Sequence, residues 1–177
     1  DPVKVAAAPL SGGLAWEHSV KDWDWVMGVN VWGVIHGVRV FTPILLRQQT
    51  EGHIVNTASV AGLLSLPGMA LYCVTKHAVV TLTESLYHDL VQHSDKVRCS
   101  LLCPAYVPTR ISESERNRPS DLQDNRAKSK EDLEREAMLR HAVQSGRISA
   151  EQVADKVFEA VRDERFYVLP HQKIKGA

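Results

Sequence analysis

Two short apolar runs, each placed between long helical patterns, constrain the fold of this chain most strongly. Residues 53–58 (HIVNTA) follow the helix-breaking Gly52, and residues 97–103 (VRCSLLC) end at Pro104. Short apolar runs bounded by glycine or proline are typical of strands that are buried on both faces of a parallel sheet. The chain therefore predicts two inner strands of such a sheet.

Helical patterns precede, separate and follow the two runs. Apolar residues recur at helical spacing over 19–49 and 70–93, and shorter helices are expected over 131–144 and 149–163, with a last strand at 166–169. This alternation predicts an α/β fold with a doubly wound parallel sheet. A chain of 177 residues suits one domain with a substantial core.

Local signals mark the helix ends and one irregularity. Ser19 with Asp22, and Ser149 with Gln152, have the spacing of capping boxes, so a helix should begin after each serine. Pro43 should kink or divide the first helix, because proline removes a backbone donor and crowds the preceding turn.

Composition limits the binding partners and the cellular compartment that we expect for this protein. Lys+Arg and Asp+Glu number 21 each and are scattered, so no nucleic-acid partner is expected. We recognise no apolar stretch of membrane-spanning length and expect no membrane partner. The three cysteines, Cys73, Cys99 and Cys103, form no paired framework and suggest reduced, buried thiols in the cytoplasm. No ligand spacing indicates a metal.

Tyr72 and Lys76 carry the strongest chemical signal. Four residues apart on a predicted helix, they lie on one face, where the ammonium should lower the pKa of the phenol. A tyrosine tuned in this way can move a proton near neutral pH. Ser59, after the first predicted strand, could hold the oxygen that is protonated. This set predicts a carbonyl/alcohol redox site.

With two further features, the chain resembles the single-domain branch of the short-chain dehydrogenase/reductase family. Asn30 lies in VNVWG, Ser59 in NTASVAG, Tyr72 and Lys76 in YCVTK, and the turn 104–109 reads PAYVPT. The resemblance implies a Rossmann-like fold, with NAD or NADP as cofactor. Residues 1–177 are interpreted as one partial domain, the C-terminal portion of that fold.

The resemblance implies a role for each matched residue. Tyr72 would be the general acid or base, Ser59 would hold the substrate oxygen, and Asn30, at a perturbed point of its helix, would hold a water that links Lys76 to solvent. Tyr72, Lys76, Pro104, Val107 and Thr109 would contact the cofactor, Lys76 through the nicotinamide ribose and Val107 through its backbone.

Structural alternatives remain for several of these residues. Asn30 could bond one helix to another, Ser59 could cap a strand end, and Thr109 could cap the following helix. Tyr106 could face substrate or only pack. Asn56 is interpreted as a hydrogen bonder between strands.

The sequence departs from the family pattern in two places. Ala105 stands where glycine is usual. The family's glycine-rich turn, which binds the pyrophosphate at a helix N-terminus, is not found ahead of Asn30. We expect the sequence to be partial, and a naturally shortened protein is the alternative. Either way, dinucleotide binding by the 177 residues alone should be weak.

The leading hypothesis is a nicotinamide-dependent oxidoreductase of a small hydrophobic ketone or secondary alcohol. Region 111–147 would supply a substrate lid, although its polar part, 112–130, could instead be a mobile surface loop. An apolar pocket is expected from four residues after Ser59: Leu63, Leu64, Leu66 and Met69.

Two alternatives are kept. The first is a non-catalytic binding or assembly module, because family members commonly form dimers or tetramers through the helices around Asn30 and Tyr72. Trp23, Trp25 and Trp32 could serve such a homo-oligomer or lie in the core. The second is a dehydratase or epimerase of the related extended branch, for which the region after Pro104 leaves little room.

Overall fold

Three parallel strands form the sheet, in the order β1 (Gly52–Thr57), β2 (Val97–Leu102) and β3 (Tyr167–Val168). The computed structural model describes residues 9–10, 12–123 and 127–171. β1 and β2 pair along their whole length, with Gly52 opposite Val97 and Thr57 opposite Leu102. The three predicted strands are confirmed, with small shifts of their ends.

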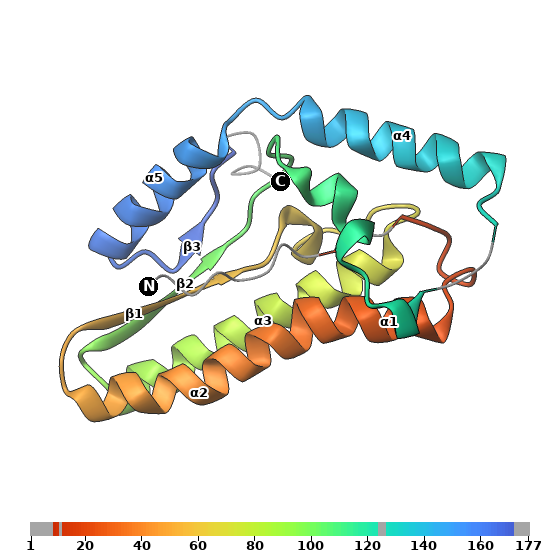
Figure 1. Ribbon diagram of the computed structural model, residues 1–177. Coiled ribbons are helices and arrows are strands. Elements are labelled where there is room, and N and C mark those ends of the chain that lie inside the picture. Colours follow the sequence, from red (N-terminus) through yellow and green to blue (C-terminus); the bar gives the residue numbers. More distant parts are fainter. Residues whose placement is uncertain (1–8, 11, 124–126, 172–177) are drawn as a thin grey trace.

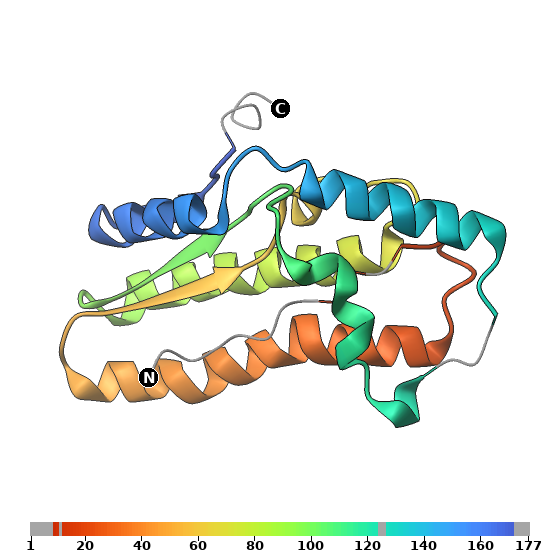
Figure 2. The same ribbon diagram turned by 45° about the horizontal axis from the view of Figure 1, so that its top comes forward.

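Helices cover both faces of this sheet, as Figures 1 and 2 show. α2 (Gly33–Gln48) and α3 (Ala70–His93) run below it in Figure 1, and α5 (Ala150–Arg162) lies on the opposite face. α4 (Lys130–Gln144) extends away from α5 above the start of α3. The predicted doubly wound α/β arrangement is therefore confirmed.

Two apolar cores explain this layering. On one face, Leu101 and Cys103 pack with Val79 and Val80 of α3. On the other face, Leu102 and Val168 pack with Val153 and Ala160 of α5. Consecutive residues of β2 thus point to opposite faces, which is why an uninterrupted apolar run predicts this strand correctly.

The first helical segment is continuous but irregular. α1 (Val20–Met27) begins at the predicted capping box, in which Ser19 and Asp22 bond each other's backbone N–H groups. A π-helical turn, Gly28–Trp32, joins it to α2. Pro43 lies inside α2 and does not divide it, so that alternative is wrong. Pro43 is exposed, and water can satisfy the carbonyl that loses its partner.

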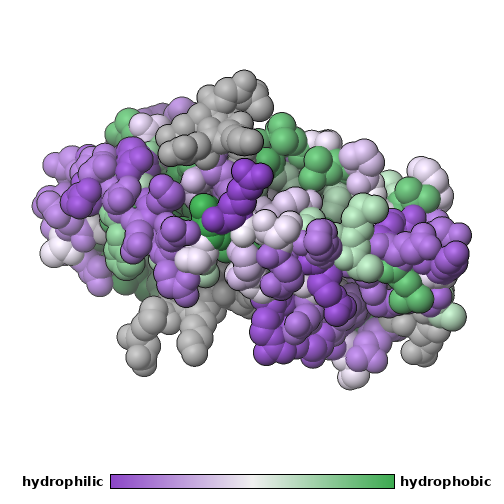
Figure 3. All heavy atoms as spheres, turned by 90° about the horizontal axis from the view of Figure 1, so that it is seen from above, coloured by the Kyte–Doolittle hydropathy of each residue, from purple (hydrophilic) through white to green (hydrophobic). Residues whose placement is uncertain are grey.

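The outer surfaces of the helices differ in polarity. Over α4 and α5 the surface is mainly hydrophilic, with smaller hydrophobic groups between (Figure 3). The helix Val20–Gln48, in contrast, is long and apolar enough to cross a membrane by length and composition, a match that we did not expect from the sequence. In this fold it contacts α3 and β1.

Candidate active site

A cavity of about 360 Å³ opens at the carboxyl ends of β1 and β2. Ligands of open parallel sheets bind at this edge. Six predicted site residues line it: Ser59, Tyr72, Lys76, Pro104, Val107 and Thr109. One cavity therefore collects residues that are up to fifty positions apart in the sequence.

Ser59 follows β1 in extended conformation and begins a 3₁₀ turn, Val60–Gly62. Its Oγ accepts a hydrogen bond from Ala61 N at 3.1 Å and donates one to Pro104 O at 3.3 Å. The capping role left open by the sequence is thus present. The same hydroxyl lies near the phenol of Tyr72 and acts to lower its pKa, so capping does not exclude a place in the site.

Tyr72 and Lys76 lie on the first turns of α3 and are almost fully buried, with 6% and 3% exposure. The Lys76 ammonium donates to Thr57 O at 3.1 Å and lies 5.6 Å from the centroid of the Tyr72 ring. The helix therefore brings the two side chains together as predicted. The ammonium, however, faces a backbone carbonyl and the ring face.

The expected lowering of the phenol pKa is wrong for this structure. Burial raises the pKa of Tyr72 to about 12, although the nearby Ser59 hydroxyl acts in the opposite direction. Burial also lowers the pKa of Lys76 to about 8. Desolvation disfavours both charged forms and outweighs their attraction here. Tyr72 consequently holds its proton firmly, and Lys76 is close to losing its own.

Asn30 lies in the π-helical turn, which confirms the predicted irregularity at this residue. Its Nδ2 donates to Thr75 Oγ1 at 3.0 Å and to Pro9 O at 3.4 Å, and Thr75 Oγ1 donates to Tyr72 O at 2.8 Å. The Asn30 amide thus bonds one helix to another. Its Oδ1 is buried without a hydrogen-bond partner, a geometry suited to a bound water. Asn30 does not line the cavity itself.

The turn after β2 forms the opposite wall. Thr109 caps the following 3₁₀ segment by accepting from Ile111 N, so its capping alternative is present, and it also lines the cavity. Tyr106 faces the cavity and remains 42% exposed. Asn56 bonds Thr83 of α3, so it joins strand to helix and not strand to strand.

The apolar lining only partly matches the prediction. Leu66 and Met69 line the cavity, whereas Leu63 and Leu64 are outside its lining and exposed. The short turn after Ser59 directs these two leucines outward. The sequence also missed distant apolar contributors that no local pattern marks: Leu10, Ile111, Val143, Ala150 and Val153.

Gly62 is a further residue that shapes the site and that the sequence did not indicate. A Cβ at this position would lie 2.6 Å from Lys76 O and 2.9 Å from Val80 Cγ2, far inside normal contact. Only glycine lets the turn that carries Ser59 lie directly on α3. A Gly in the turn was visible in the sequence, but its contact with α3 was not.

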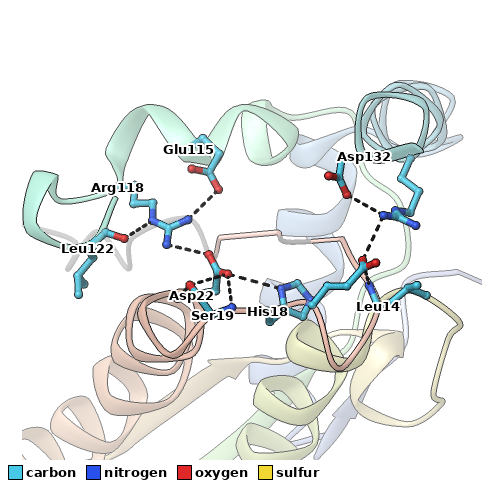
Figure 4. Close-up of polar contacts among 10 residues, drawn as sticks. Leu14, His18, Ser19, Asp22, Glu115, Arg118, Leu122 and Asp132 are labelled. Atoms are coloured by element: carbon cyan, nitrogen blue, oxygen red, sulfur yellow. Dashed lines mark hydrogen bonds and ion pairs between the residues drawn. The ribbon is translucent and has the colours of Figure 1, made fainter. Parts of the chain in front are cut away.

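Charged contacts attach the segment after Thr109 to α1 (Figure 4). Arg118 bonds Asp22 at 2.7 Å and Leu122 O at 2.8 Å, and its guanidinium stacks 4.9 Å from the ring centre of Trp25. Burial opposes ionisation of Asp22, but bonds from Ser19 and Arg118 hold its pKa below its ordinary value. Arg135 of α4 pairs likewise with Glu17, at 3.4 Å.

Within the described residues, no cluster of three or more His, Cys, Asp or Glu side chains is placed to hold a metal. The three cysteines are free and buried. Burial raises the pKa of both Cys99 and Cys103 to about 11, so these thiols stay protonated.

Comparisons of sequence and of structure with known proteins lead to the same family. The sequence profile described as short chain dehydrogenase matches residues 4–120. A crystal structure of a short chain dehydrogenase/reductase from Burkholderia phymatum in complex with NAD has a TM-score of 0.93 and 53% identity, over 96% of this chain and 60% of that one.

Two curated relatives are also similar. The CLA biosynthesis dehydrogenase/reductase of Lactiplantibacillus plantarum is 33% identical over 90% of this chain and 56% of the relative. The meso-2,3-butanediol dehydrogenase of Serratia marcescens is 41% identical over 56% of this chain and 38% of the relative. The chain thus spans little more than half the length of its relatives.

Proposed function

This chain belongs to the short-chain dehydrogenase family, and we propose that its cavity is the active site of an oxidoreductase that interconverts a secondary alcohol and a ketone with NAD or NADP. One observation carries the proposal: Ser59, Tyr72 and Lys76 line one largely apolar cavity. The NAD in the Burkholderia phymatum structure supports the choice of cofactor class.

The residues present fit the nicotinamide end of such a cofactor. Lys76 supplies a donor in the cavity, and the turn 104–109 presents backbone that belongs to no helix or strand. At about 360 Å³ the cavity suits a ring-sized group and a small substrate, and not a whole dinucleotide. When bound, the cofactor supplies the hydride. Lys76, Pro104, Val107 and Thr109 would hold its nicotinamide end.

The chain's own groups would manage the proton. Ser59 would hold the substrate oxygen and stabilise the charge that develops on it. Tyr72, protonated because it is buried, would give its proton to that oxygen during reduction. Lys76 would favour the resulting phenolate, because a neighbouring positive charge stabilises it. Asn30, through Thr75, would hold the carbonyl end of Tyr72 in place.

The cavity lining supports a neutral, hydrophobic substrate. Lys76 is the one charged side chain among the described lining residues, and its ammonium already bonds Thr57 O. Leu66, Met69 and Val143 contribute apolar surface. Region 111–147 would act as the lid, because Ile111 and Val143 reach the cavity from its two ends.

A non-catalytic assembly role is less well supported. Lys76, Asn30 and Ser59 are all buried, and burying polar groups costs free energy unless a function or full bonding compensates. A protein freed from catalysis would have no reason to retain this set.

A homo-oligomer is still proposed beside the catalytic role, because α2 and the end of the π-helical turn before it leave apolar side chains exposed. Trp32 and Val40 are each 52% exposed, and Phe41 and Ile44 also face solvent. Trp25 instead lies in the core with Val26 and Leu71, and Trp23 packs against that cluster. Phe41→Glu should shift a dimer or tetramer toward monomer in light scattering, whereas Arg39→Glu, at an exposed polar position of the same helix, should not. We also propose a cytoplasmic location, in agreement with the three free cysteines.

The function can be tested in a fusion that places the N-terminal segment of the Burkholderia phymatum relative ahead of this chain. We expect NADH oxidation that depends on cyclohexanone, and at least about 100-fold lower kcat/KM with pyruvate, because an apolar cavity does not solvate a carboxylate. Faster turnover with pyruvate, or bound NADH without any ketone reduction, would contradict the proposal. A titration of the 177 residues alone with NADH should show weak binding.

A further inference from the structure

His171 makes two hydrogen bonds to consecutive residues on the cavity wall. It follows Pro170, just after β3, and lies more than sixty residues from its partners in the sequence. Its Nδ1 lies 3.1 Å from Ala105 N, and its Nε2 lies 3.3 Å from Tyr106 O. One imidazole therefore bridges a backbone donor and a backbone acceptor of the same turn.

These partners define the state of the ring. The N–H of Ala105 can only donate, so Nδ1 must carry a lone pair. In a neutral imidazole Nε2 then carries the proton, which it donates to Tyr106 O. One neutral tautomer satisfies both bonds. A protonated ring would place an N–H opposite the N–H of Ala105 and break that bond.

The turn needs such support because it belongs to no helix or strand. Its first carbonyl, Pro104 O, accepts from Val60 N at 3.0 Å and from Ser59 Oγ at 3.3 Å. Thr109 O, at its far end, accepts from Gln144 at 3.2 Å. His171 supplies the bonds to the middle of the turn, between these two attachments.

Close packing also holds the middle of the turn 104–109 in place. A Cβ on Gly146 would lie 2.5 Å from Tyr106 O, so the chain after α4 rests directly on this carbonyl. Pro104, Ala105, Tyr106 and Val107 all line the cavity with Ser59 and Tyr72. A shift of the middle of the turn therefore changes the shape of the site.

We propose that His171 is a positioning residue, which in its neutral Nε2–H tautomer fixes the backbone of Ala105 and Tyr106 and thereby the cavity wall opposite Tyr72. This deepens the proposed function and rests on it for its catalytic meaning. The ring acts through the turn and does not touch the reacting atoms.

The surroundings of His171 include charges of both signs. An open hollow of about 780 Å³ behind the turn is lined by His171 and, from α5 and the loop before it, by four charged residues: Arg147, Asp155, Lys156 and Glu159.

The test uses the 177-residue chain and two variants, His171→Phe and His171→Asn. Phenylalanine keeps the ring without either bond, and the asparagine oxygen can replace Nδ1 as acceptor. In the unchanged chain, NMR should show the Nε2–H tautomer and a coupling across the hydrogen bond between Ala105 N and His171 Nδ1. Hydrogen exchange at Ala105 should be about 10-fold faster in His171→Phe and within about 3-fold of normal in His171→Asn.

The tautomer supplies the reading that a packing role would not produce, because only the Nε2–H form satisfies both hydrogen bonds. Leu101 N, which bonds Phe166 O in the sheet, is the internal reference and should stay constant. A missing coupling, an Nδ1–H tautomer, or equal loss in both variants would overturn the proposal.

A ketone titration separates this proposal from the proposed function. Cyclohexanone added to the chain should shift the amides of Val107 and Ala61 in the unchanged chain, and more weakly in His171→Phe. Failure of cyclohexanone to bind any of the three proteins would count against the substrate class, while the coupling and the exchange rates would still decide the role of His171.

Discussion

Two sides of the cavity are held by different kinds of contact. The catalytic side, with Ser59, Tyr72 and Lys76, rests on backbone hydrogen bonds and on the close contact of Gly62 with α3. The cover, the segment after Thr109, is attached to α1 by the ion pair of Arg118 with Asp22, whose side chains are little exposed. The reacting groups thus belong to the packed core, and the cover belongs to the surface.

This difference has a physical consequence. Interior packing responds sharply to small changes of volume, whereas the loss of one ion pair mainly loosens the segment that the pair attaches. Changes on the catalytic side should therefore affect chemistry or global stability, and changes in the cover should act locally.

Tyr72→Phe should have the largest effect. In the fusion with the dinucleotide-binding segment, kcat should fall about 1000-fold or more, because the proton donor is lost while the ring still fills its place. NADH affinity should change little. Tyr87→Phe, on the same helix but packed against Phe166, is the matched control and should keep its activity. Near-normal turnover of Tyr72→Phe would contradict the role of Tyr72 as the proton donor.

Gly62→Ala should destabilise the chain by about 3 kcal/mol, because the new methyl group meets the Lys76 carbonyl and overpacks the contact. Urea unfolding measures the change. Gly37→Ala is the control, since nothing lies within 4 Å of that Cβ on α2, and it should stabilise by about 0.5 kcal/mol. Equal effects of the two substitutions would show that the turn is not held as described.

Arg118→Met should cost about 2 kcal/mol, because Asp22 loses its partner in a poorly exposed place. Amides of residues 110–122 should exchange faster, while those at the start of α3 should not. Arg110→Met removes an exposed pair with Glu113 and should stay within about 0.5 kcal/mol of the unchanged chain. Faster exchange at Tyr72 as well would break the proposed independence of the two sides.

Lys76→Met should have the smallest effect on stability, and its sign depends on pH. The pKa of Lys76 falls from 10.5 to about 8 in the folded chain, so the unfolded state binds more protons between these values. The unchanged chain should gain stability relative to the variant from about pH 8 to 10. At pH 7 the variant should be the more stable of the two, because it buries no charge there, and the loss of the bond to Thr57 O offsets part of this gain. A pH-independent difference would contradict the shift.

The sequence predicts best what local periodicity determines. The helix over 70–93 and the parallel strands follow from it, and so does the meeting of Tyr72 with Lys76. The irregular helix at Asn30 was expected from the family pattern and not from Pro43, which α2 accommodates on its exposed side.

What the sequence does not predict depends on contacts between distant segments. The direction of the Tyr72 pKa shift is set by burial, which no local spacing encodes. The outward position of Leu63 depends on the turn after Ser59, and the contact at Gly62 depends on α3. His171 carries no motif, because its role follows only from where β3 ends beside the turn 104–109.

If this cavity directs hydride to a neutral carbonyl, a label on the cofactor should appear in the alcohol. The fusion protein is given NADH deuterated at the transferable position of C4, with cyclohexanone as the acceptor. We expect cyclohexanol with deuterium on its carbinol carbon, and almost none from Tyr72→Phe at equal NADH occupancy. Cyclohexanol without deuterium, or an equal yield from Tyr72→Phe, would contradict it.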